Sequence, residues 1–475
     1  MKFRYDCMKT LALAAFMSLL LAGCSGNSGS GTGAPDPADE APAEPAPGDS
    51  ASVEPLRTIQ AGPEDYRAAL AGLQPGDWLQ LEAGTYRHGL RLHGLSGTTE
   101  HPIVISGPES GEPAEFLARS GANTVSLRDA AHIKIRHLTL DGAQLNVAGV
   151  VAEASSSWTH DITLEHLRIR NHDVSQGNTG ITTRSPAWNW VIRNNEIRDV
   201  GTGLYLGRPD GSGPFVAGLI ENNLIAATLG YNMQIKHQNV RASVPGMPEE
   251  PRETVIRYNV FSKAERASGG GQARPNLLVG HWPPEGPGAS DRYLIYGNLF
   301  HQNPHQRLFQ GEGNVALYNN LFFNTYGDAL LVWRHNDRPK QIHVLFNTIV
   351  AEGFGIRIDA PDPAYEQVVA GNAVFAGNPL AIEGAVAQNG NYSDTRARAR
   401  DFLESPTPDL ATLDLHPRAG ALVYSGAALP DYGFPNLDRD YNGRPRALTP
   451  WGAYASQEDS NPGRTGGIGV NVGVH

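Results

Sequence analysis

Cysteine is almost absent from this chain of 475 residues, which contains only Cys7 and Cys24. Both lie close to the N-terminus, so disulfide bonds cannot stabilise the rest of the chain. The sequence also lacks a basic tract, because 49 acidic residues outnumber 38 Lys and Arg residues and the formal net charge is −11. This balance argues against nucleic acid as a partner.

Long hydrophobic runs are also scarce, and the apolar stretch of residues 11–21 is too short to span a membrane. Three basic residues precede it: Lys2, Arg4 and Lys9. The stretch ends in Leu-Ala-Gly-Cys, which resembles a bacterial lipobox. That resemblance implies a lipoprotein signal peptide over residues 1–23, a lipid anchor on Cys24, and a membrane as partner. Ser25 resembles the signal for the outer membrane, with the chain facing the periplasm or the cell surface. An ordinary signal peptide with a chance Cys is the alternative.

Residues 24–55 contain mostly Gly, Ser, Pro and Ala with several acidic residues and no Lys or Arg. Such a composition cannot bury enough apolar area to fold, so it predicts a disordered tether behind the lipidated Cys. A glycine-rich end predicts a flexible tail over residues 456–475. The folded body is therefore expected over residues 56–455.

A short cassette built around Asn recurs through this body. It first occurs at residues 192–197 (IRNNEI), and its later central residues are Asn223, Asn259, Asn298, Asn320, Asn347 and Asn372, at steps of 36, 39, 22, 27 and 25 residues. Strand-length repeats of this kind predict a solenoid in which each coil buries its apolar face against its neighbours. Asn tolerates left-handed backbone angles, and stacked side-chain amides can form hydrogen bonds from coil to coil. We therefore predict an Asn ladder along the solenoid.

Two stretches near the ends of the body carry a resemblance to known families. Residues 73–86 (LQPGDWLQLEAGTY), 95–98 (LSGT) and 102–105 (PIVI) resemble the start of the alginate lyase and chondroitinase B family of polysaccharide lyases. Residues 438–446 (DRDYNGRPR) and 451–454 (WGAY) resemble a terminal motif of extracellular β-helix proteins. The resemblance implies an all-β, single-domain, right-handed parallel β-helix. We expect a short capping helix near residues 63–73.

A second strand follows each Asn strand, and seven of these strands align over six positions: residues 180–185, 203–208, 232–237, 276–281, 307–312, 329–334 and 355–360. The second and fourth positions are mostly apolar and are expected to point inward, so the third and fifth point outward. The sixth position collects polar side chains on consecutive coils: Arg208, His237, His281, Glu312 and Arg334.

Some motifs of the related enzymes are missing. The lyase family pairs a Lys with an Arg that is followed by His-Gly. Lys236 matches the Lys, whereas Arg334-His335-Asn336 resembles the second motif but lacks its Gly. Arg274-Pro275 does not complete the Arg-x-Pro-x-x-Arg motif of pectate lyases. The Asp-Pro-His-Asp of mannuronan epimerases and the Asp-Asp pair of polygalacturonases are absent.

β-Elimination on a uronide requires a cation for the C5 carboxylate, a base for the C5 proton and a proton source for the leaving oxygen. We predict Lys236 as the base and His237 or His281 as the proton shuttle. Arg208 and Arg334 are predicted to hold the carboxylate. The predicted catalytic residues are thus Lys236, His237, His281 and Arg334. The predicted substrate-binding residues are Arg208, Tyr205, Arg184, Glu312, Trp333, His335, Arg307 and Arg274. Each is alternatively an ordinary solvated residue on a solenoid face.

These features predict a carbohydrate-active protein of the cell envelope that cleaves an anionic polysaccharide by β-elimination. A uronate C5-epimerase is an alternative, because it abstracts the same proton. A non-catalytic protein that binds polysaccharide is a second alternative. Calcium stays open as a cofactor, although no ligand set is visible in the sequence.

Overall fold

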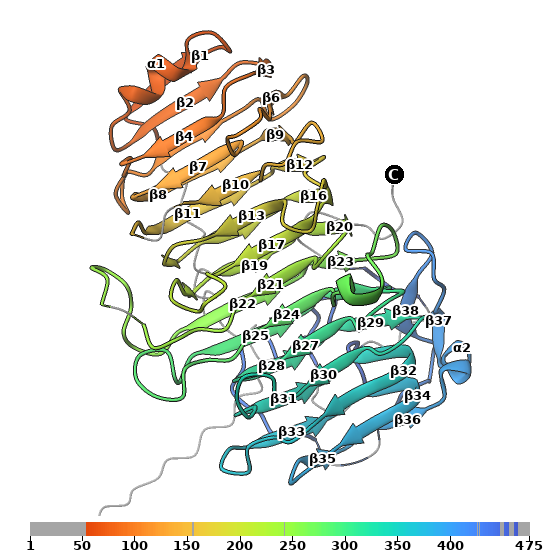
Figure 1. Ribbon diagram of the computed structural model, residues 1–475. Coiled ribbons are helices and arrows are strands. Elements are labelled where there is room, and N and C mark those ends of the chain that lie inside the picture. The colour runs from red at the N-terminus through yellow and green to blue at the C-terminus, as the bar shows by residue number, and fades with distance from the viewer. Residues whose placement is uncertain are drawn as a thin grey trace, which may run out of the picture. The chain divides into compact units, whose positions relative to one another are not determined.

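The computed structural model describes residues 54–153, 156–241, 243–424, 426, 428–446, 451–455 and 460–463. Over this part the chain forms a parallel β-helix, whose strands stack side by side from coil to coil (Figure 1). The predicted signal peptide, Cys24 and most of the tether and tail lie outside the described residues. No helix in the described ranges is long and apolar enough to cross a membrane.

Each coil contributes strands to three faces. Face 1 consists of β1 (Arg57–Ala61), β2 (Asp77–Leu81), β5 (Ile103–Ser106), β8 (Ala130–Arg136), β11 (Thr159–Glu165), β14 (Ala187–Trp188), β15 (Val191–Arg193), β18 (Phe215–Val216), β19 (Leu219–Glu221), β22 (Glu253–Arg257), β25 (Arg292–Tyr296), β28 (Val315–Tyr318), β31 (Ile342–Leu345), β33 (Gln367–Ala370) and β35 (Ala387–Asn389).

Face 2 consists of β3 (Gly84–Tyr86), β6 (Ala114–Leu117), β9 (Leu138–Asp141), β12 (Arg168–Arg170), β16 (Glu196–Val200), β20 (Leu224–Thr228), β23 (Val260–Ser262), β26 (Leu299–His301), β29 (Leu321–Asn324), β32 (Thr348–Ile358), β34 (Ala373–Ile382) and β36 (Tyr392–Asp394). Face 3 consists of β4 (Leu90–His93), β7 (Val125–Arg128), β10 (Val150–Ala152), β13 (Thr179–Thr183), β17 (Thr202–Leu206), β21 (Met233–Ile235), β24 (Leu277–Val279), β27 (Phe309–Gly311) and β30 (Leu330–Val332). The long strands β32 and β34 bend and continue onto face 3.

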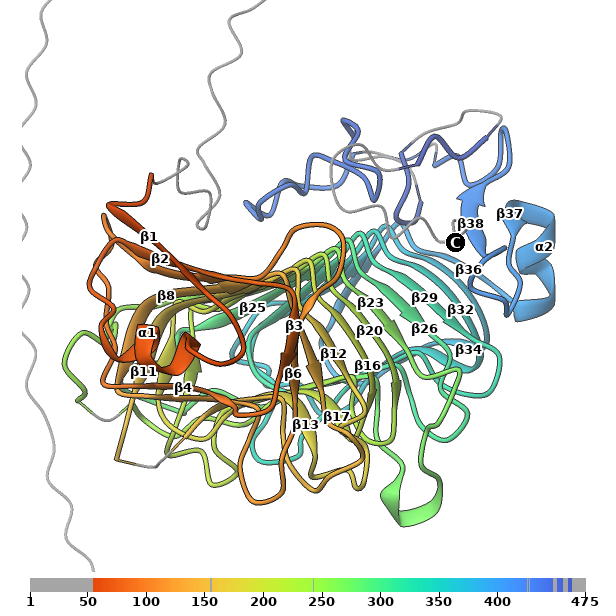
Figure 2. The same ribbon diagram turned by 90° about the horizontal axis from the view of Figure 1, so that it is seen from above.

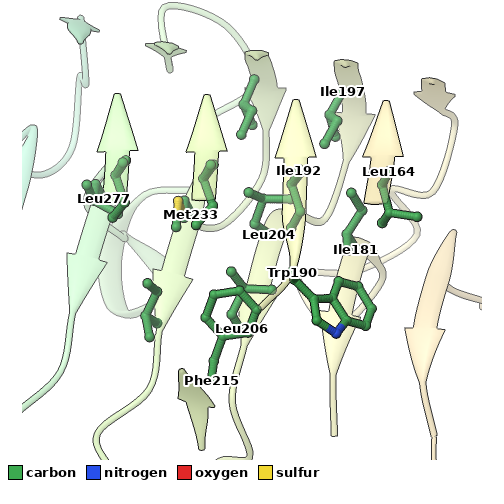
Figure 3. Close-up of a cluster of buried hydrophobic side chains, with 14 of the residues drawn as sticks. Leu164, Ile181, Trp190, Ile192, Ile197, Leu204, Leu206, Phe215, Met233 and Leu277 are labelled. Atoms are coloured by element: carbon green, nitrogen blue, oxygen red, sulfur yellow. The ribbon is translucent and has the colours of Figure 1, made fainter. Parts of the chain in front are cut away.

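The core lies inside the coil, where the inward-pointing apolar side chains of the three faces pack against one another. Ile192 of β15, Ile197 of β16 and Leu204 of β17 are fully buried and point into this interior (Figure 3). Alternate residues of a strand point to opposite sides, so their neighbours along the strands face outward. Burial of this apolar interior holds each coil against the next. The predicted fold class is confirmed.

A ladder of Asn side chains runs along the bend between faces 1 and 2, and all of them are buried except the partly exposed Asn391. Its members are Asn195, Asn223, Asn259, Asn298, Asn320, Asn347, Asn372 and Asn391. In each step the Nδ2 atom donates to the Oδ1 atom of the next Asn at 2.9–3.0 Å. The backbone N–H donates to the same oxygen. The predicted Asn ladder is therefore confirmed, and it extends one coil further at its C-terminal end, to Asn391.

The residue before each ladder Asn has left-handed backbone angles. Asn194, Asn222 and Asn319 have φ of 59°, 55° and 53°, and Gly297 and Gly371 occupy the same place in other coils. Left-handed angles suit Asn and Gly, which explains why the repeat so often reads Asn-Asn or Gly-Asn. The first residue of the pair thus makes the bend, and the hydrogen bonds of the second stabilise it.

The first coil is closed by the helix α1 (Tyr66–Ala71), which lies within the predicted range. Tyr66 is fully buried, and its ring contacts the rings of Tyr86 at 5.0 Å and Phe116 at 5.7 Å in edge-on geometry. This aromatic cluster covers the apolar end that an uncapped solenoid would expose.

The coils end at Asp394, well before the boundary at residue 455 that the sequence predicts. The chain continues as a 3-10 turn (Arg396–Arg398), the short helix α2 (Ala399–Phe402) and an antiparallel pair of β37 (Leu403–Ser405) and β38 (Asp414–Pro417) beside the coils (Figure 2). Tyr318 donates to the Pro435 carbonyl at 2.8 Å, and Arg446 donates to Asn319 Oδ1 at 3.1 Å. The terminal motif thus packs on the outside of the helix.

Replacing Asn320 by Leu tests the ladder. A Leu fits this place sterically, because Leu167 occupies it one coil before Asn195 and donates its backbone N–H to that Asn. The change removes the acceptor of the backbone N–H and Nδ2 groups of Asn298. It also removes the donor to the Ile295 carbonyl and to Asn347 Oδ1. Unpaired buried groups cost about 1–3 kcal/mol each, so the free energy of unfolding should fall by at least about 2 kcal/mol.

Denaturant unfolding followed by circular dichroism measures this loss. Asn389→Leu is the matched control, because Asn389 is exposed in β35. An Asn320→Leu protein as stable as this control would contradict a stabilising ladder.

Candidate functional site

A groove with a volume of about 600 Å³ opens on face 3 over β13, β17 and β21. Its lining residues are Gln176, Gly177, Thr179, Thr182, Arg184, Thr202, Tyr205, Arg208, Pro209, Tyr231, Gln234, Lys236 and Arg274. Five of them are predicted site residues: Arg184, Tyr205, Arg208, Lys236 and Arg274. The structure therefore brings these five together around one cavity.

The register of face 3 places the groove residues in rows across the coils. Tyr205 pairs with Thr182 on one side and with Gln234 on the other, so the three share one outward row. Lys236 lies two residues after Gln234, and its backbone N–H donates to the Leu206 carbonyl at 2.9 Å. Residues two apart along a strand face the same side. Lys236 therefore projects beside Tyr205 and Gln234.

Lys236 lies between two glycines. Gly207 and Gly280 hold its place on the preceding and following coils, where the backbone ladder continues past the strand ends. A Cβ atom at Gly280 would lie 2.3 Å from the backbone nitrogen of His237, so no larger residue fits there without displacing this segment. Burial lowers the pKa of Lys236, and the more distant Glu312 carboxylate partly opposes the shift. A lowered pKa increases the fraction of neutral amine, which can accept a proton.

Two tyrosines complete the groove. Burial, with a smaller effect of Tyr231, raises the pKa of Tyr205 to about 12, so its phenol is protonated at neutral pH. Burial also raises the pKa of Tyr231, while the Arg274 guanidinium acts in the opposite direction. That guanidinium lies 5.9 Å from the centre of the Tyr231 ring. Tyr205 can thus donate a proton or a hydrogen bond to a bound group.

The loops that carry Tyr231 and Arg274 are both bonded to Lys263, which follows β23 and is fully buried. Its Nζ atom donates to the carbonyls of Gly230 and Arg274, the second at 2.9 Å. A 3-10 turn (Gly270–Gln272) precedes Arg274, and its Gln272 carbonyl accepts a hydrogen bond from Gln176 at 2.7 Å. These contacts fix the rim of the groove.

The charge of the groove is opposite to that of the chain. Four of the lining residues are cationic, and no Asp or Glu belongs to the lining among the described residues. The whole chain has a net charge of −11. A concave site lined by one sign of charge concentrates ligands of the opposite sign. The charge of the lining therefore favours an anionic ligand over a cationic one.

The predicted histidines lie outside this lining. The rings of His237 and His281 meet edge to face with centroids 5.6 Å apart, on neighbouring coils as predicted. Burial lowers the pKa of His237, and the positive charges of Lys236 and His281 add to the effect. Both rings contribute to a surface beside the groove rather than to its walls.

The predicted residues of the later coils are also outside the lining. Arg334 and His335 are exposed after β30, and the His335 ring lies 5.8 Å from the ring of Trp333. Arg307 is partly buried and donates to Gln310 Oε1 at 3.0 Å. None of these four predicted residues belongs to the lining of the cavity over β17 and β21: Arg307, Trp333, Arg334 and His335.

The predicted register is wrong by one residue in the coil of Glu312. Leu278 pairs with Gln310 rather than with Phe309, because Phe309 is fully buried and points into the core. Glu312 therefore follows Lys236 and Gly280 in the fifth position instead of His281 in the sixth. Its Oε2 atom accepts the backbone N–H groups of residues 335 and 336 at 3.2 and 2.6 Å. This buried carboxylate anchors a loop.

Tyr231, Gln234 and Lys263 are site residues that the sequence reasoning missed. Gln234 occupies the same outward position as Tyr205 in the aligned strands, so the alignment is sufficient to identify it as a candidate. Tyr231 and Lys263 lie in irregular segments after β20 and β23, where no periodicity points to them.

No protein-family model matches the chain. No curated protein matches it either. Among solved structures, the chain is similar to an alginate lyase from Paenibacillus sp. str. FPU-7, with 17% identity, 71% of this chain and 99% of that chain covered, and a TM-score of 0.38. It is similar to the PL6 family alginate lyase AlyGC, with 13% identity, 71% and 53% coverage and a TM-score of 0.45, so the match spans about half of that enzyme.

A further similarity is to the A-module of a mannuronan C-5 epimerase from Azotobacter vinelandii. Identity is 17%, coverage is 68% of this chain and 92% of that module, and the TM-score is 0.39. At these identities the similarities concern the parallel β-helix fold alone.

The buried Lys263 predicts a specific pH dependence of stability. Burial lowers its pKa to about 7, whereas an unfolded Lys has a pKa of about 10.4. Between these values the unfolded chain binds more protons than the folded chain, so the contribution of Lys263 to stability rises with pH from about 7 to about 10. Lys263→Met removes this contribution to the increase of the free energy of unfolding with pH.

Unfolding midpoints of both proteins at pH 7 and pH 9.5 measure the effect. We expect the stability of the wild type relative to Lys263→Met to increase between the two pH values. Equal changes in the two proteins would show that Lys263 is not deprotonated on folding.

Proposed function

We propose that this protein binds a polysaccharide of uronic acids in the face 3 groove and cleaves it by β-elimination. The observation that carries the proposal is the groove lining, which combines four cations, two tyrosines and no carboxylate among the described residues. Uronic acids supply both the negative charge that this lining attracts and an acidic C5 proton beside a carboxylate.

Recognition of the carboxylates is assigned to the arginines. Arg184, Arg208 and Arg274 come from different coils and surround one cavity, so they can contact successive sugar units. Arg208 also lies 3.3 Å from Asp210, which orients its guanidinium at the rim. A guanidinium is permanently charged and binds a carboxylate through two parallel hydrogen bonds. Neutralising the C5 carboxylate stabilises the carbanion that forms when the C5 proton leaves.

Lys236 is assigned as the base. Its neutral amine takes the C5 proton, and the electron pair of the C5–H bond forms the C4=C5 double bond as the C4–O4 bond breaks. The lowered pKa of Lys236 supports this role, because it makes the neutral amine available closer to neutral pH. Glycines at the same position of both neighbouring coils, Gly207 and Gly280, mean that no side chain there competes with Lys236 for contact with a sugar ring.

Tyr205 is assigned as the acid, in place of the histidines. The departing O4 takes the phenolic proton of Tyr205, and the tyrosinate later regains a proton from solvent. Tyr205 lies in the same lining as Lys236, and its raised pKa keeps it protonated until the leaving oxygen carries negative charge. His237 and His281 remain a second candidate pair, because His237 follows Lys236 directly and the ring of His281 on the next coil lies 5.6 Å from that of His237.

The same pair of groups also suits a C5-epimerase. Lys236 would remove the C5 proton from one side of the sugar, and Tyr205 would return a proton from the other side without bond cleavage. The lack of a carboxylate pair in the lining disfavours a hydrolase, which requires two.

The groove lining does not fit a calcium site on its own. Calcium takes six to eight oxygen ligands, commonly carboxylates, and the described lining residues include no Asp or Glu. No step of the proposed reaction therefore passes through a metal ion.

The decisive test is a panel of alginate, pectate, hyaluronan and chondroitin, each incubated with the protein with and without calcium. Ultraviolet absorbance of unsaturated uronide ends establishes elimination and identifies the substrate. Binding without absorbance would contradict the lyase proposal. NMR of the recovered polymer would then distinguish an epimerase from a binding protein.

Lys236→Ala should lower kcat on the identified substrate by at least about 100-fold, because a positioned base contributes that much or more. The fold should be retained, since this side chain lies outside the core. Arg338→Ala is the matched control, an exposed cation outside the groove lining, and should keep full activity. Full activity of Lys236→Ala would refute its assignment as the base.

We also propose that a lipid on Cys24 holds the protein at the bacterial outer membrane, where a long polymer can reach the groove. The support is the Leu-Ala-Gly-Cys sequence behind a short apolar stretch. Cys24→Ser should abolish incorporation of labelled fatty acid and move the protein out of the membrane fraction. Unchanged membrane association of the Ser variant would contradict the anchor.

A further inference from the structure

Two imidazoles and a carboxylate gather on face 1, away from the strands that carry the groove. His132 belongs to β8, and His160 and Asp161 belong to β11 on the next coil. Ala131 pairs with His160 and Ile133 pairs with Ile162, so His132 lies opposite Asp161. One nitrogen or oxygen of each residue lies within 4.8 Å of those of the other two.

The backbone explains why neighbouring residues share this side of the strand. His132 and Asp161 both have φ of 52°, which interrupts the regular alternation of side chains at the same place on both coils. His160 and Asp161 are therefore both partly exposed, although adjacent residues of a regular strand face opposite sides. The interruption turns two consecutive polar side chains toward one point.

The imidazole of His160 is held in place before any ligand arrives. It stacks against the indoles of both Trp158 and Trp188, with ring centroids at 5.2 and 4.6 Å and planes inclined by 27° and 15°. The two indoles lie 6.1 Å from each other, so the three rings form one cluster. Its Nδ1 atom lies 2.5 Å from Asp161 Oδ2. A ring fixed in this way loses little conformational entropy when it binds a ligand.

Asp161 is oriented as well. Its Oδ1 atom accepts a hydrogen bond from Asn189 Nδ2 at 3.3 Å, which leaves Oδ2 directed at the two histidines. His132 Nε2 lies 4.0 Å from that Oδ2. A carboxylate with one oxygen held by an amide and the other facing imidazoles is the arrangement of an oriented metal ligand.

We infer that His132, His160 and Asp161 bind a divalent transition-metal ion of the Zn²⁺ type. Two imidazole nitrogens and one carboxylate oxygen form a donor set that such ions prefer, and three protein ligands leave a position for water. Metal–ligand distances of about 2.0–2.2 Å require rotation of His132 toward the other two. Its side chain is 20% exposed and that of Asp161 is 34% exposed, so the ion reaches them from solvent.

The bound ion joins two neighbouring coils on face 1. The groove residues lie on face 3, so this site is independent of the proposed elimination and does not rest on it. Without a metal, the same three residues would form only a hydrogen bond between His160 and Asp161, with His132 beside them.

Titration of the full-length, untagged, chelator-treated protein with ZnCl₂ in a calorimeter tests the inference. We expect saturable binding of one Zn²⁺ that is lost in His132→Asn and in His160→Asn. Asn189→Ala, which removes the partner of Asp161, should weaken binding by about 10-fold. Circular dichroism of each variant verifies the fold.

His166→Asn is the matched control. It removes one imidazole from another pair, His137 and His166, which stack at 4.8 Å beside Glu109, and it should leave Zn²⁺ affinity unchanged. The absorption spectrum of the Co²⁺-loaded wild type should show visible bands, and quenching of the stacked indoles should accompany Co²⁺ binding. Absence of saturable Zn²⁺ binding, or equal affinity in wild type and His132→Asn, would overturn the inference.

Discussion

The hydrogen bond between successive Asn side chains is the constraint on which the architecture depends. Each amide donates to the next amide and also to a backbone carbonyl, so a buried polar group is satisfied at every coil. Apolar contacts alone would allow one coil to slide along another, whereas the amide pair fixes where each coil begins. The register set at this bend extends around the coil, and equivalent residues therefore form columns along every face.

Function follows from these columns. On face 3, the fifth position reads Gly207, Lys236 and Gly280 on three consecutive coils, so no side chain at this position of either neighbouring coil lies beside the Lys236 amine. The loops before β21 and β24 then bring Tyr231 and Arg274 to the same cavity, where Lys263 holds their backbones. A regular scaffold thus supplies the spacing, and the irregular loops supply the specific groups of the groove.

The repeat made the fold and the Asn ladder predictable, because the same local pattern occurs in every coil. It also pointed to the groove residues Arg184, Tyr205 and Lys236, which lie on a regular strand or directly after one. The register failed where Leu308 and Phe309 are consecutive apolar residues, since either could have been the inward one, and both are buried. Loop residues escaped prediction because their place depends on contacts distant in sequence, which no periodicity reports.

The central claim is that the groove recognises carboxylates. The most direct measurement uses the Lys236→Ala protein, which is expected to turn over the ligand at least about 100-fold more slowly. It compares the affinity of this variant for a uronate oligosaccharide with that for the carboxyl-reduced, neutral counterpart. The account predicts that the charged oligosaccharide binds, that salt weakens this binding, and that the neutral one does not bind. Equal affinity for the two sugars, or binding that is unchanged when Arg184 and Arg208 are replaced by Ala, would contradict it.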